Sequence, residues 1–187
     1  MEKNLEMSEF FNCVLYLAVT GFAFFLVGRI VPKNHFQADR FPFRSFRFEK
    51  EGRIYDALHI KKWKEGVPDM SVILPALIPS KRLPKVLTSA QLVSMIQETC
   101  VAEWTHDLLC LAGFGCVFLW KGISGWIVSV IYALGNLPYI IIQRYNRPKF
   151  IRLLKKLQAK EASYTNRKQV ITREKGTYIE LQYGPRS

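Results

Sequence analysis

The sequence predicts an all-α membrane protein with about three transmembrane helices, an interfacial cytoplasmic loop and a basic C-terminal tail. Apolar residues are concentrated in three blocks that hold almost no charge, whereas Lys and Arg are concentrated outside these blocks. A helix that crosses a bilayer needs about 20 predominantly apolar residues. The blocks therefore place spans at about residues 10–31, 104–121 and 124–143 of one integral-membrane domain, residues 1–160, which a polar tail over residues 161–187 follows.

The first two blocks differ in how clearly they predict a span. An acidic stretch with Glu2, Glu6 and Glu9 precedes the first block, whereas a cleavable signal peptide begins with basic residues. We therefore interpret the first block as a retained helix. The second block reaches the length of a span only if it begins at Trp104, and a re-entrant hairpin with the third block is the alternative.

The net charge of +12 is distributed unevenly along the chain. Residues 33–103 and 144–187 hold nearly all Lys and Arg, and the turn at residues 121–124 holds a single Lys. Because cytoplasmic loops are enriched in Lys and Arg, we expect a multi-pass protein of the cell membrane with the N-terminus outside and the central loop and C-terminus in the cytoplasm. The basic residues flank the spans and alternate with aromatic residues, which favours an anionic lipid surface over nucleic acid as a partner.

The central loop contains interfacial and helix-starting patterns. Residues 41–48 combine Phe with Arg, which suits a segment on the lipid surface, and a short strand or core loop is the alternative. Trp63 stands among lysines, as interfacial tryptophans do. Prolines exclude a long helix over residues 68–84. The capping box at residues 88–91 predicts a helix that begins at Ser89 and continues into the second span.

The last third of the chain predicts a kinked span and a cationic helix. Pro138 removes a helical hydrogen bond inside the third span, and Asn136 needs a polar partner there. Residues 150–160 have the amphipathic pattern of a cationic interfacial helix, and residues 177–183 form a strand-like run. The cysteines lie in or beside apolar segments without the spacing of a metal site, which predicts buried free thiols at Cys13, Cys100, Cys110 and Cys116.

The helix that leads into the second span carries Glu98, Glu103 and His106 on one face. An imidazole is largely neutral at pH 7 and can accept a proton. Glu103, one turn from His106, would orient the ring and stabilise the imidazolium, as the acid of a catalytic triad does. The alternatives are an interfacial His–Glu pair without catalytic function and, for Glu98, a solvated helix face.

Several segments, taken in order, carry a resemblance to a known family: residues 45–52 (SFRFEKEG), 62–64 (KWK), 98–106 (ETCVAEWTH) and 143–148 (QRYNRP). Over residues 29–157 the chain resembles the glycosyl-4,4'-diaponeurosporenoate acyltransferase family. These are small membrane enzymes that fatty-acylate a sugar hydroxyl in the last step of staphyloxanthin-type carotenoid synthesis. Departures at Cys100, Val101 and Asp107, together with a longer tail, leave another glycolipid or amphiphile open as the acceptor.

The resemblance implies transfer of a fatty acyl group to a hydroxyl, the sugar 6-hydroxyl, of a glycosylated carotenoid or similar glycolipid. The expected donor is an acyl thioester such as acyl-CoA, with no tightly bound cofactor and no metal. Acyl transfer needs a base and donors for the developing oxyanion, so His106 is the expected base and Glu103 and Glu98 are further catalytic candidates. The expected substrate-binding residues are Asn146, Arg144, Arg147, Gln143, Tyr145 and Trp63. For the two arginines, which suit coenzyme A phosphates, positive-inside anchoring is the alternative.

Two functions of other classes remain open. The Glu103-x-x-His106 spacing also occurs in di-metal bundle proteins, which would indicate a metal-dependent lipid-modifying enzyme, although those proteins use two such motifs. A non-enzymatic membrane adaptor would leave the polar helix face unexplained. The sequence has no Gly-x-Ser-x-Gly elbow and no histidine followed by aspartate after four residues, so we expect direct transfer without an acyl-enzyme.

Overall fold

The computed structural model describes residues 2–68 and 87–183, and within these ranges the chain is helical and contains no strand. This confirms the predicted all-α class. The long helices are α1 (Glu2–Ile30), α5 (Ser89–Gly113) and α7 (Ile123–Tyr183). The short helices are η1 (Lys33–His35), η2 (Arg47–Gly52), α2 (Ile54–Ala57), α3 (Ile60–Trp63), η3 (Lys64–Gly66) and α6 (Cys116–Leu119).

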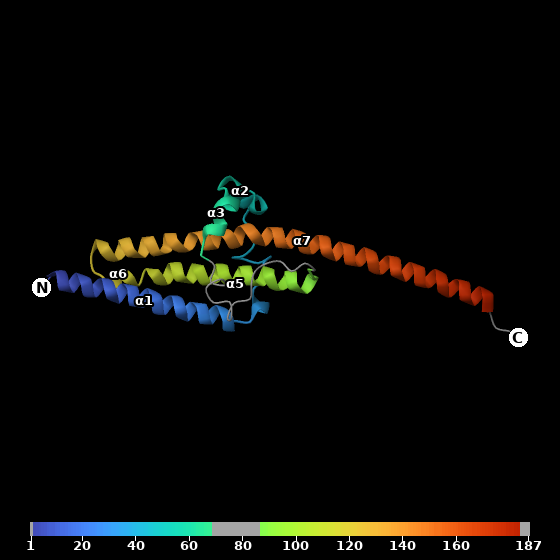
Figure 1. Cartoon of the computed structure of the whole chain (residues 1–187), viewed down its shortest axis with the longest axis horizontal. Coiled ribbons are helices and arrows are strands. Elements are labelled where there is room, and N and C mark those ends of the chain that lie inside the picture. Colours follow the sequence, from blue (N-terminus) through green and yellow to red (C-terminus); the bar gives the residue numbers. More distant parts are fainter. Residues whose placement is uncertain (1, 69–86, 184–187) are drawn as a thin grey trace.

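The three long helices lie side by side, with α5 in the middle (Figure 1). The chain runs in one direction along α1, returns along α5 and runs out again along α7, so α5 is antiparallel to both neighbours. The N-terminus and α6 lie at one end of this bundle, and the far part of α7 extends beyond the other end. Helices α2 and α3 lie against the middle of α7. The second and third blocks are therefore antiparallel, an arrangement that fits consecutive spans and a re-entrant hairpin alike.

Two helices in the described residues are long and apolar enough to cross a membrane, Leu5–Ile30 in α1 and Ile123–Gln169 in α7. Only 6% of the apolar window in α1 and 17% of that in α7 is buried, so these side chains do not form the core of a soluble protein. Large exposed apolar surfaces need a membrane or a partner. The two helices therefore associate this protein with a membrane.

The second expected span has a different structure. Residues 104–121 are divided between the end of α5, the short helix α6 and the turn after it. Helix α5 is long enough at 25 residues but is not apolar enough to cross a membrane in the same way, since it carries Glu98, Glu103 and Asp107. The helix start itself is as predicted: Thr88 Oγ1 accepts from the Gln91 N–H at 3.2 Å, and Gln91 Oε1 accepts from the Thr88 N–H at 2.9 Å.

Small residues allow close packing at the end of the bundle where α5 gives way to α6. A Cβ atom on Gly113 would lie 2.6 Å from the Tyr132 ring, and one on Gly115 would lie 2.3 Å from the Tyr16 hydroxyl. The Tyr16 hydroxyl donates to the Ala112 carbonyl at 2.8 Å, which joins α1 to α5. All four cysteines are free, and all are buried except the half-buried Cys110, which confirms the predicted free thiols.

The C-terminal part departs from one prediction. Helix α7 continues through Pro138 and Pro148 as one helix, so the expected kink at Pro138 does not interrupt it (Figure 1). The strand-like run at residues 177–183 is part of α7, so that interpretation is wrong; the described chain offers no second strand to pair with it. Residues 41–48 contain turns and no strand. The loop expected at residues 68–84 lies almost entirely outside the described residues.

Candidate functional site

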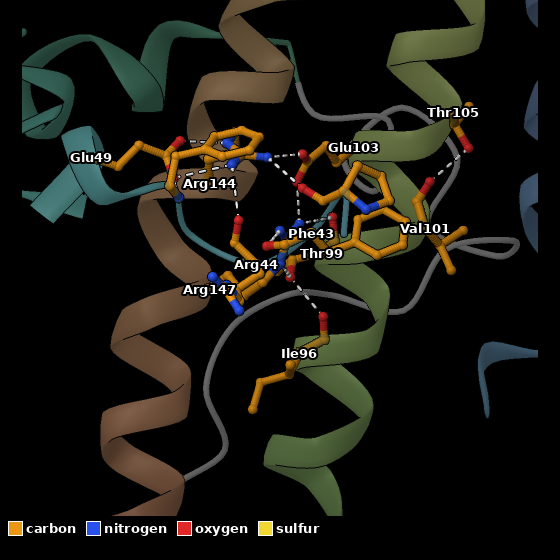
Figure 2. A network of polar contacts seen from close by, with 12 residues as sticks. Phe43, Arg44, Glu49, Ile96, Thr99, Val101, Glu103, Thr105, Arg144 and Arg147 are labelled. Atoms are coloured by element: carbon orange, nitrogen blue, oxygen red, sulfur yellow. Dashed lines mark hydrogen bonds and ion pairs between the residues drawn. The ribbon is translucent and has the colours of Figure 1, made fainter. Parts of the chain in front are cut away.

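Two arginines on α7 and a glutamate on α5 form the centre of the interface between these helices. Arg144 and Arg147 are three residues apart, and both reach Glu103. Nη1 of Arg144 donates to Oε1 of Glu103, and Nη2 of Arg147 donates to Oε2, so each carboxylate oxygen has its own guanidinium. Figure 2 shows these side chains pointing toward one another between the two helices. Glu103 and Arg147 are each only 2% exposed, so their ion pair is buried.

Glu49 on η2 joins this group because of a sharp backbone bend. Lys50 and Glu51 have φ angles of 47° and 56°, and Gly52 has 88°, a region that favours glycine. The Phe46 N–H donates to Glu49 Oε2 at 2.7 Å, which fixes the side chain just before the bend. The Glu49 carboxylate thereby points toward α7 (Figure 2). We call Glu49, Glu103, Arg144 and Arg147 the ion-pair cluster.

The protein supplies an acceptor for every N–H group of Arg144. Nε donates to Glu49 Oε1 at 2.5 Å, and Nη2 donates to Glu49 Oε2 at 3.1 Å. Nη1 donates to the Pro42 carbonyl at 3.2 Å in addition to its partner on α5, and Nη2 donates to the Arg44 carbonyl at 3.4 Å. The Phe46 ring centroid lies 4.6 Å from the Arg144 Cζ. In this conformation Arg144 has no N–H left for a phosphate of coenzyme A.

Arg147 connects α7 to α5 and to the segment at residues 41–48. Its Nε donates to Thr99 Oγ1 at 2.9 Å, and its Nη2 donates to the Thr99 carbonyl at 3.0 Å. Its Nη1 donates to the Phe43 carbonyl at 2.7 Å. The Phe43 ring centroid lies 5.5 Å from the guanidinium carbon. These bonds satisfy a charged group that would otherwise be costly to bury.

Hydrogen bonding decides the protonation of the outer part of the cluster. Burial by itself would raise the pKa of Glu49, but the hydrogen bonds from Arg144 and from the Tyr55 hydroxyl outweigh it, and the pKa lies below its ordinary value. Burial, reinforced by the neighbouring Glu49 carboxylate, raises the pKa of Tyr55. Glu49 is therefore ionised at neutral pH while Tyr55 stays protonated and donates. The cluster as a whole holds two carboxylates and two guanidiniums and is electrically neutral.

His106 lies one turn after Glu103 on α5 and contacts a different part of α7. Its Nδ1 is 2.8 Å from Oδ1 of Asn136, and its ring stacks on Tyr139 with 4.5 Å between centroids and 11° between planes. Nδ2 of Asn136 donates to the Tyr132 carbonyl at 2.9 Å, so the amide oxygen is the atom that faces the imidazole. We call His106 and Asn136 the histidine pair.

The Asn136 contact selects a tautomer of the imidazole. An amide oxygen only accepts hydrogen bonds, so Nδ1 of His106 carries the hydrogen. In the neutral ring the lone pair is then on Nε2, which is the nitrogen able to take a proton from a substrate. The partner at Nδ1 is therefore the amide of Asn136 and not the carboxylate of Glu103, which the spacing on α5 predicted. Both Glu103 oxygens accept from arginines.

The other predicted site residues are spread over three places. Glu98 accepts from Lys33 Nζ at 2.8 Å on an exposed part of α5, away from Arg144. Tyr145 is buried, and its hydroxyl donates to Asp56 Oδ1 at 3.3 Å. Trp63 packs on the same cluster of buried residues as Tyr145 and donates from Nε1 to the Leu58 carbonyl at 2.9 Å, so both hold the short helices onto α7.

Gln143 and Asn146 are half-buried on the face of α7 that carries Tyr139, one and two turns further along. The structure gives neither side chain a hydrogen bond within the described ranges. Their amide groups can therefore contact a ligand, whereas the N–H groups of Arg144 and Arg147 already donate within the protein.

Sequence reasoning assigned no role to Glu49 and left Asn136 without a partner. Glu49 was part of a quoted motif, but its distance from α7 in sequence gave no sign of the contact. The sequence did contain a signal for the contact between His106 and Asn136. In a hairpin that turns at Lys121, the two residues lie equally far from the turn. The described residues contain no group of three or more His, Cys, Asp or Glu side chains arranged to hold a metal ion.

These features define a class of all-helical, membrane-associated proteins with a buried ion-pair cluster and a hydrogen-bonded histidine between two antiparallel helices. The profile of one family, glycosyl-4,4'-diaponeurosporenoate acyltransferase, matches residues 39–156, which is more than half of the chain. The chain belongs to this family. The matched segment contains the whole ion-pair cluster and the histidine pair.

Curated relatives agree with the family match. A glycosyl-4,4'-diaponeurosporenoate acyltransferase of Staphylococcus aureus strain N315 is 29% identical over 162 residues, which cover 84% of this chain and 94% of the relative. The protein of the same name from strain Newman is 29% identical over 163 residues, covering 86% and 95%. No solved structure matches the chain.

Proposed function

We propose that this protein is a membrane acyltransferase that esterifies a hydroxyl of a glycosylated carotenoid or a similar glycolipid, at the sugar 6-hydroxyl, using an acyl thioester such as acyl-CoA. The observation that carries this proposal is the family match over the segment that builds both the ion-pair cluster and the histidine pair. The relatives are named as acyltransferases of glycosyl-4,4'-diaponeurosporenoate. A carotenoid or lipid acceptor is also consistent with two apolar helices.

In the proposed reaction His106 acts as the general base. The acceptor oxygen attacks the thioester carbonyl carbon while its proton passes to Nε2 of His106. The tetrahedral intermediate then expels the thiolate, which takes the proton from the imidazolium, so the products are an ester and a free thiol. The Asn136 contact supports this role in two ways. Before the transfer it keeps the hydrogen on Nδ1, so Nε2 is the nitrogen that accepts the proton. Throughout the reaction Oδ1 of Asn136 accepts from the Nδ1 N–H.

Gln143 and Asn146 are the proposed donors to the reacting carbonyl. Both carry an amide NH₂ on the Tyr139 face of α7, and an amide can stabilise a developing oxyanion. Arg144 and Arg147 have a positioning role in this proposal, because their donors are already used to hold α5, α7 and the segment at residues 41–48 together. Glu103 then positions the helix on which His106 lies.

We also propose the orientation in the membrane that the charge distribution favours, with the N-terminus outside and the central loop and C-terminus in the cytoplasm. The antiparallel bundle supports this, since the N-terminus and the turn before α7 are at one end. The test is cysteine labelling of intact cells in a background without native cysteines. An impermeant reagent should label Ser8→Cys and not Lys64→Cys, and the reverse pattern would contradict the orientation.

The function itself is tested with purified protein in liposomes that contain a glycosylated carotenoid and acyl-CoA. Mass spectrometry should detect the acyl ester of the acceptor and free coenzyme A in equal amounts. Lipid profiles of cells with and without the gene should differ by the same heavier species. A folded protein that forms no ester with any acyl thioester, in cells whose glycolipids are unchanged, would refute the proposal.

A further inference from the structure

An open hollow of about 390 Å³ lies where the segment at residues 41–55 meets α5 and α7. This is within the size range of small-molecule sites. Part of the ion-pair cluster forms its floor, and aromatic side chains form its rim. The hollow is lined by Phe41, Pro42, Phe46, Phe48, Glu49, Tyr55, Glu103, Asp107, Ile140, Ile141 and Arg144. We call it the aromatic hollow.

The charges of the aromatic hollow do not suit an anion. Its floor holds two carboxylates, Glu49 and Glu103, and one guanidinium, Arg144, whose N–H groups the protein already uses. Asp107 on α5 adds a carboxylate to the wall, and this half-buried side chain has no hydrogen bond to any residue in the described ranges. A phosphate or a fatty acid would meet an uncompensated negative charge here. A neutral ligand that donates hydrogen bonds would find an acceptor.

The rim is apolar and exposed. Phe41 is 83% exposed and Phe48 is 63% exposed, although both line the aromatic hollow. Phe46 and Phe48 are stacked, with 5.5 Å between their centroids and 11° between their planes. Exposed aromatic surface beside a few convergent polar groups is typical of a binding site. A carboxylate next to flat aromatic faces suits a sugar, whose hydroxyls donate and whose C–H face packs on a ring.

We propose that the aromatic hollow binds the sugar of a neutral glycosylated amphiphile, with Asp107 accepting a hydrogen bond from a sugar hydroxyl and the phenylalanine rim contacting the apolar part. This rests on the proposed function, because such a ligand is the acceptor of the acyl group. Asp107 follows His106 directly on α5, so the hollow begins one residue from the proposed base, although His106 itself does not line it. Asp107 is a binding residue in this arrangement, and the hollow determines which acceptor is used.

The test measures binding without catalysis. Octyl glucoside below its micelle concentration is titrated into the protein in lipid nanodiscs, with empty nanodiscs subtracted and octyl phosphocholine as the ligand without a sugar. Asp107→Ala should weaken glucoside binding roughly tenfold, as expected when a hydrogen bond to a charged group is lost. Phe48→Ala should weaken binding of both ligands several-fold. The matched control is Glu51→Gln, which changes an exposed carboxylate outside the hollow and should bind as wild type does.

Circular dichroism confirms folding of each variant, and Asp107→Asn replaces Asp107→Ala if the latter does not fold. Saturation-transfer NMR on the wild type gives a second measurement, in which the octyl-chain protons should receive magnetisation from the aromatic side chains. The inference is overturned if the folded Asp107 variant binds octyl glucoside as tightly as the wild type does. It is also overturned if that variant loses affinity for octyl phosphocholine to the same extent. If esters form but Asp107 has no effect, only the inference fails. If binding depends on Asp107 but no ester forms, the proposed function fails instead.

Discussion

The ion-pair cluster and the histidine pair lie on the same two helices, one turn apart on α5, but their side chains are used differently. In the cluster, Glu103 gives each oxygen to a different arginine, and Arg144 has an acceptor for every N–H group. In the histidine pair, Asn136 engages Nδ1 of His106, while the imidazole is half-buried. The cluster is neutral and saturated, whereas in the pair the Asn136 contact determines which imidazole nitrogen carries the hydrogen.

This difference separates structural residues from reactive ones. A saturated buried cluster can gain nothing from a ligand without first losing its own bonds, which costs several kcal/mol. A histidine held through Nδ1 can exchange a proton at Nε2 without any change in that contact. We therefore expect substitutions in the cluster to change stability and substitutions in the pair to change turnover.

The largest effect is expected for Arg147→Met. The change removes one of the two partners of the buried Glu103 and the donor to the Phe43 carbonyl. Breaking a buried ion pair costs about 3–5 kcal/mol. The free energy of unfolding, measured by SDS titration in mixed micelles, should fall by that amount.

Arg152→Met is the matched control, because it removes an arginine from the same helix. Arg152 pairs with Glu51 at 3.4 Å, and both side chains are exposed. Exposed pairs contribute about 1 kcal/mol or less. Equal losses of stability in the two variants would show that the cluster has no special structural role.

The next effect is on catalysis. His106→Ala should lower turnover by roughly 10²-fold or more, the usual scale for loss of a general base. The free energy of unfolding should fall by no more than about 1–3 kcal/mol, because the change leaves the buried Asn136 oxygen without a donor but keeps the ion-pair cluster intact. The measurement combines initial rates of ester formation with the SDS titration. Near-normal turnover in the folded variant would remove His106 from the mechanism.

Asn136 gives a smaller effect of the same kind. Asn136→Leu removes the acceptor at Nδ1, so the imidazole loses its fixed tautomer, and kcat should fall roughly tenfold, the scale of one hydrogen bond. KM for donor and acceptor should not change, because Asn136 is a positioning residue. Asn136→Asp keeps an acceptor and should retain more activity than Asn136→Leu. A rise in KM without a fall in kcat would indicate substrate binding instead.

Local patterns in the sequence were enough to predict part of this structure. The apolar blocks gave α1 and the first part of α7, and the capping box gave the start of α5. In the structure, the turn about residues 121–124 places the α7 arginines beside the polar face of α5. On α5 the partner of Arg144 is Glu103. Glu103 is further from the turn than His106, so along the hairpin it lies closer to Arg144.

What the sequence did not predict depends on long-range contacts. Glu49 reaches Arg144 only because three successive residues after it have positive φ, and no local propensity predicts such a bend in non-glycine residues. The Phe43 and Pro42 carbonyls satisfy arginines through backbone atoms, which carry no residue-type signal. The sequence also did not predict that α5 ends within the second block, where Gly113 and Gly115 pack against tyrosines.

Acid should weaken the outer part of the cluster. The pKa of Glu49 in the folded protein lies below its ordinary value, so Glu49 stabilises the fold above the unfolded-state pKa, and this contribution is lost as pH falls through the folded-state pKa. The free energy of unfolding should therefore decline in acid below the ordinary glutamate range. Glu49→Gln should cost about 1–3 kcal/mol at neutral pH and make the decline shallower. An identical acid decline in wild type and variant would contradict this.

The smallest expected effect is none at all, and it tests whether the cluster and the histidine pair are separate sites. Glu103 and His106 have the spacing of a ligand pair in di-metal bundles, and a shared metal would join them. Both Glu103 oxygens already accept from guanidiniums, so a metal at Glu103 would have to displace Arg144 or Arg147 from a buried position. We expect the rate of ester formation to survive dialysis against a chelator, with no gain on adding back Mg²⁺, Mn²⁺ or Zn²⁺. A loss of rate that one of these ions restores would place Glu103 and His106 in one metal site, and the separation of structural from reactive residues would then be wrong.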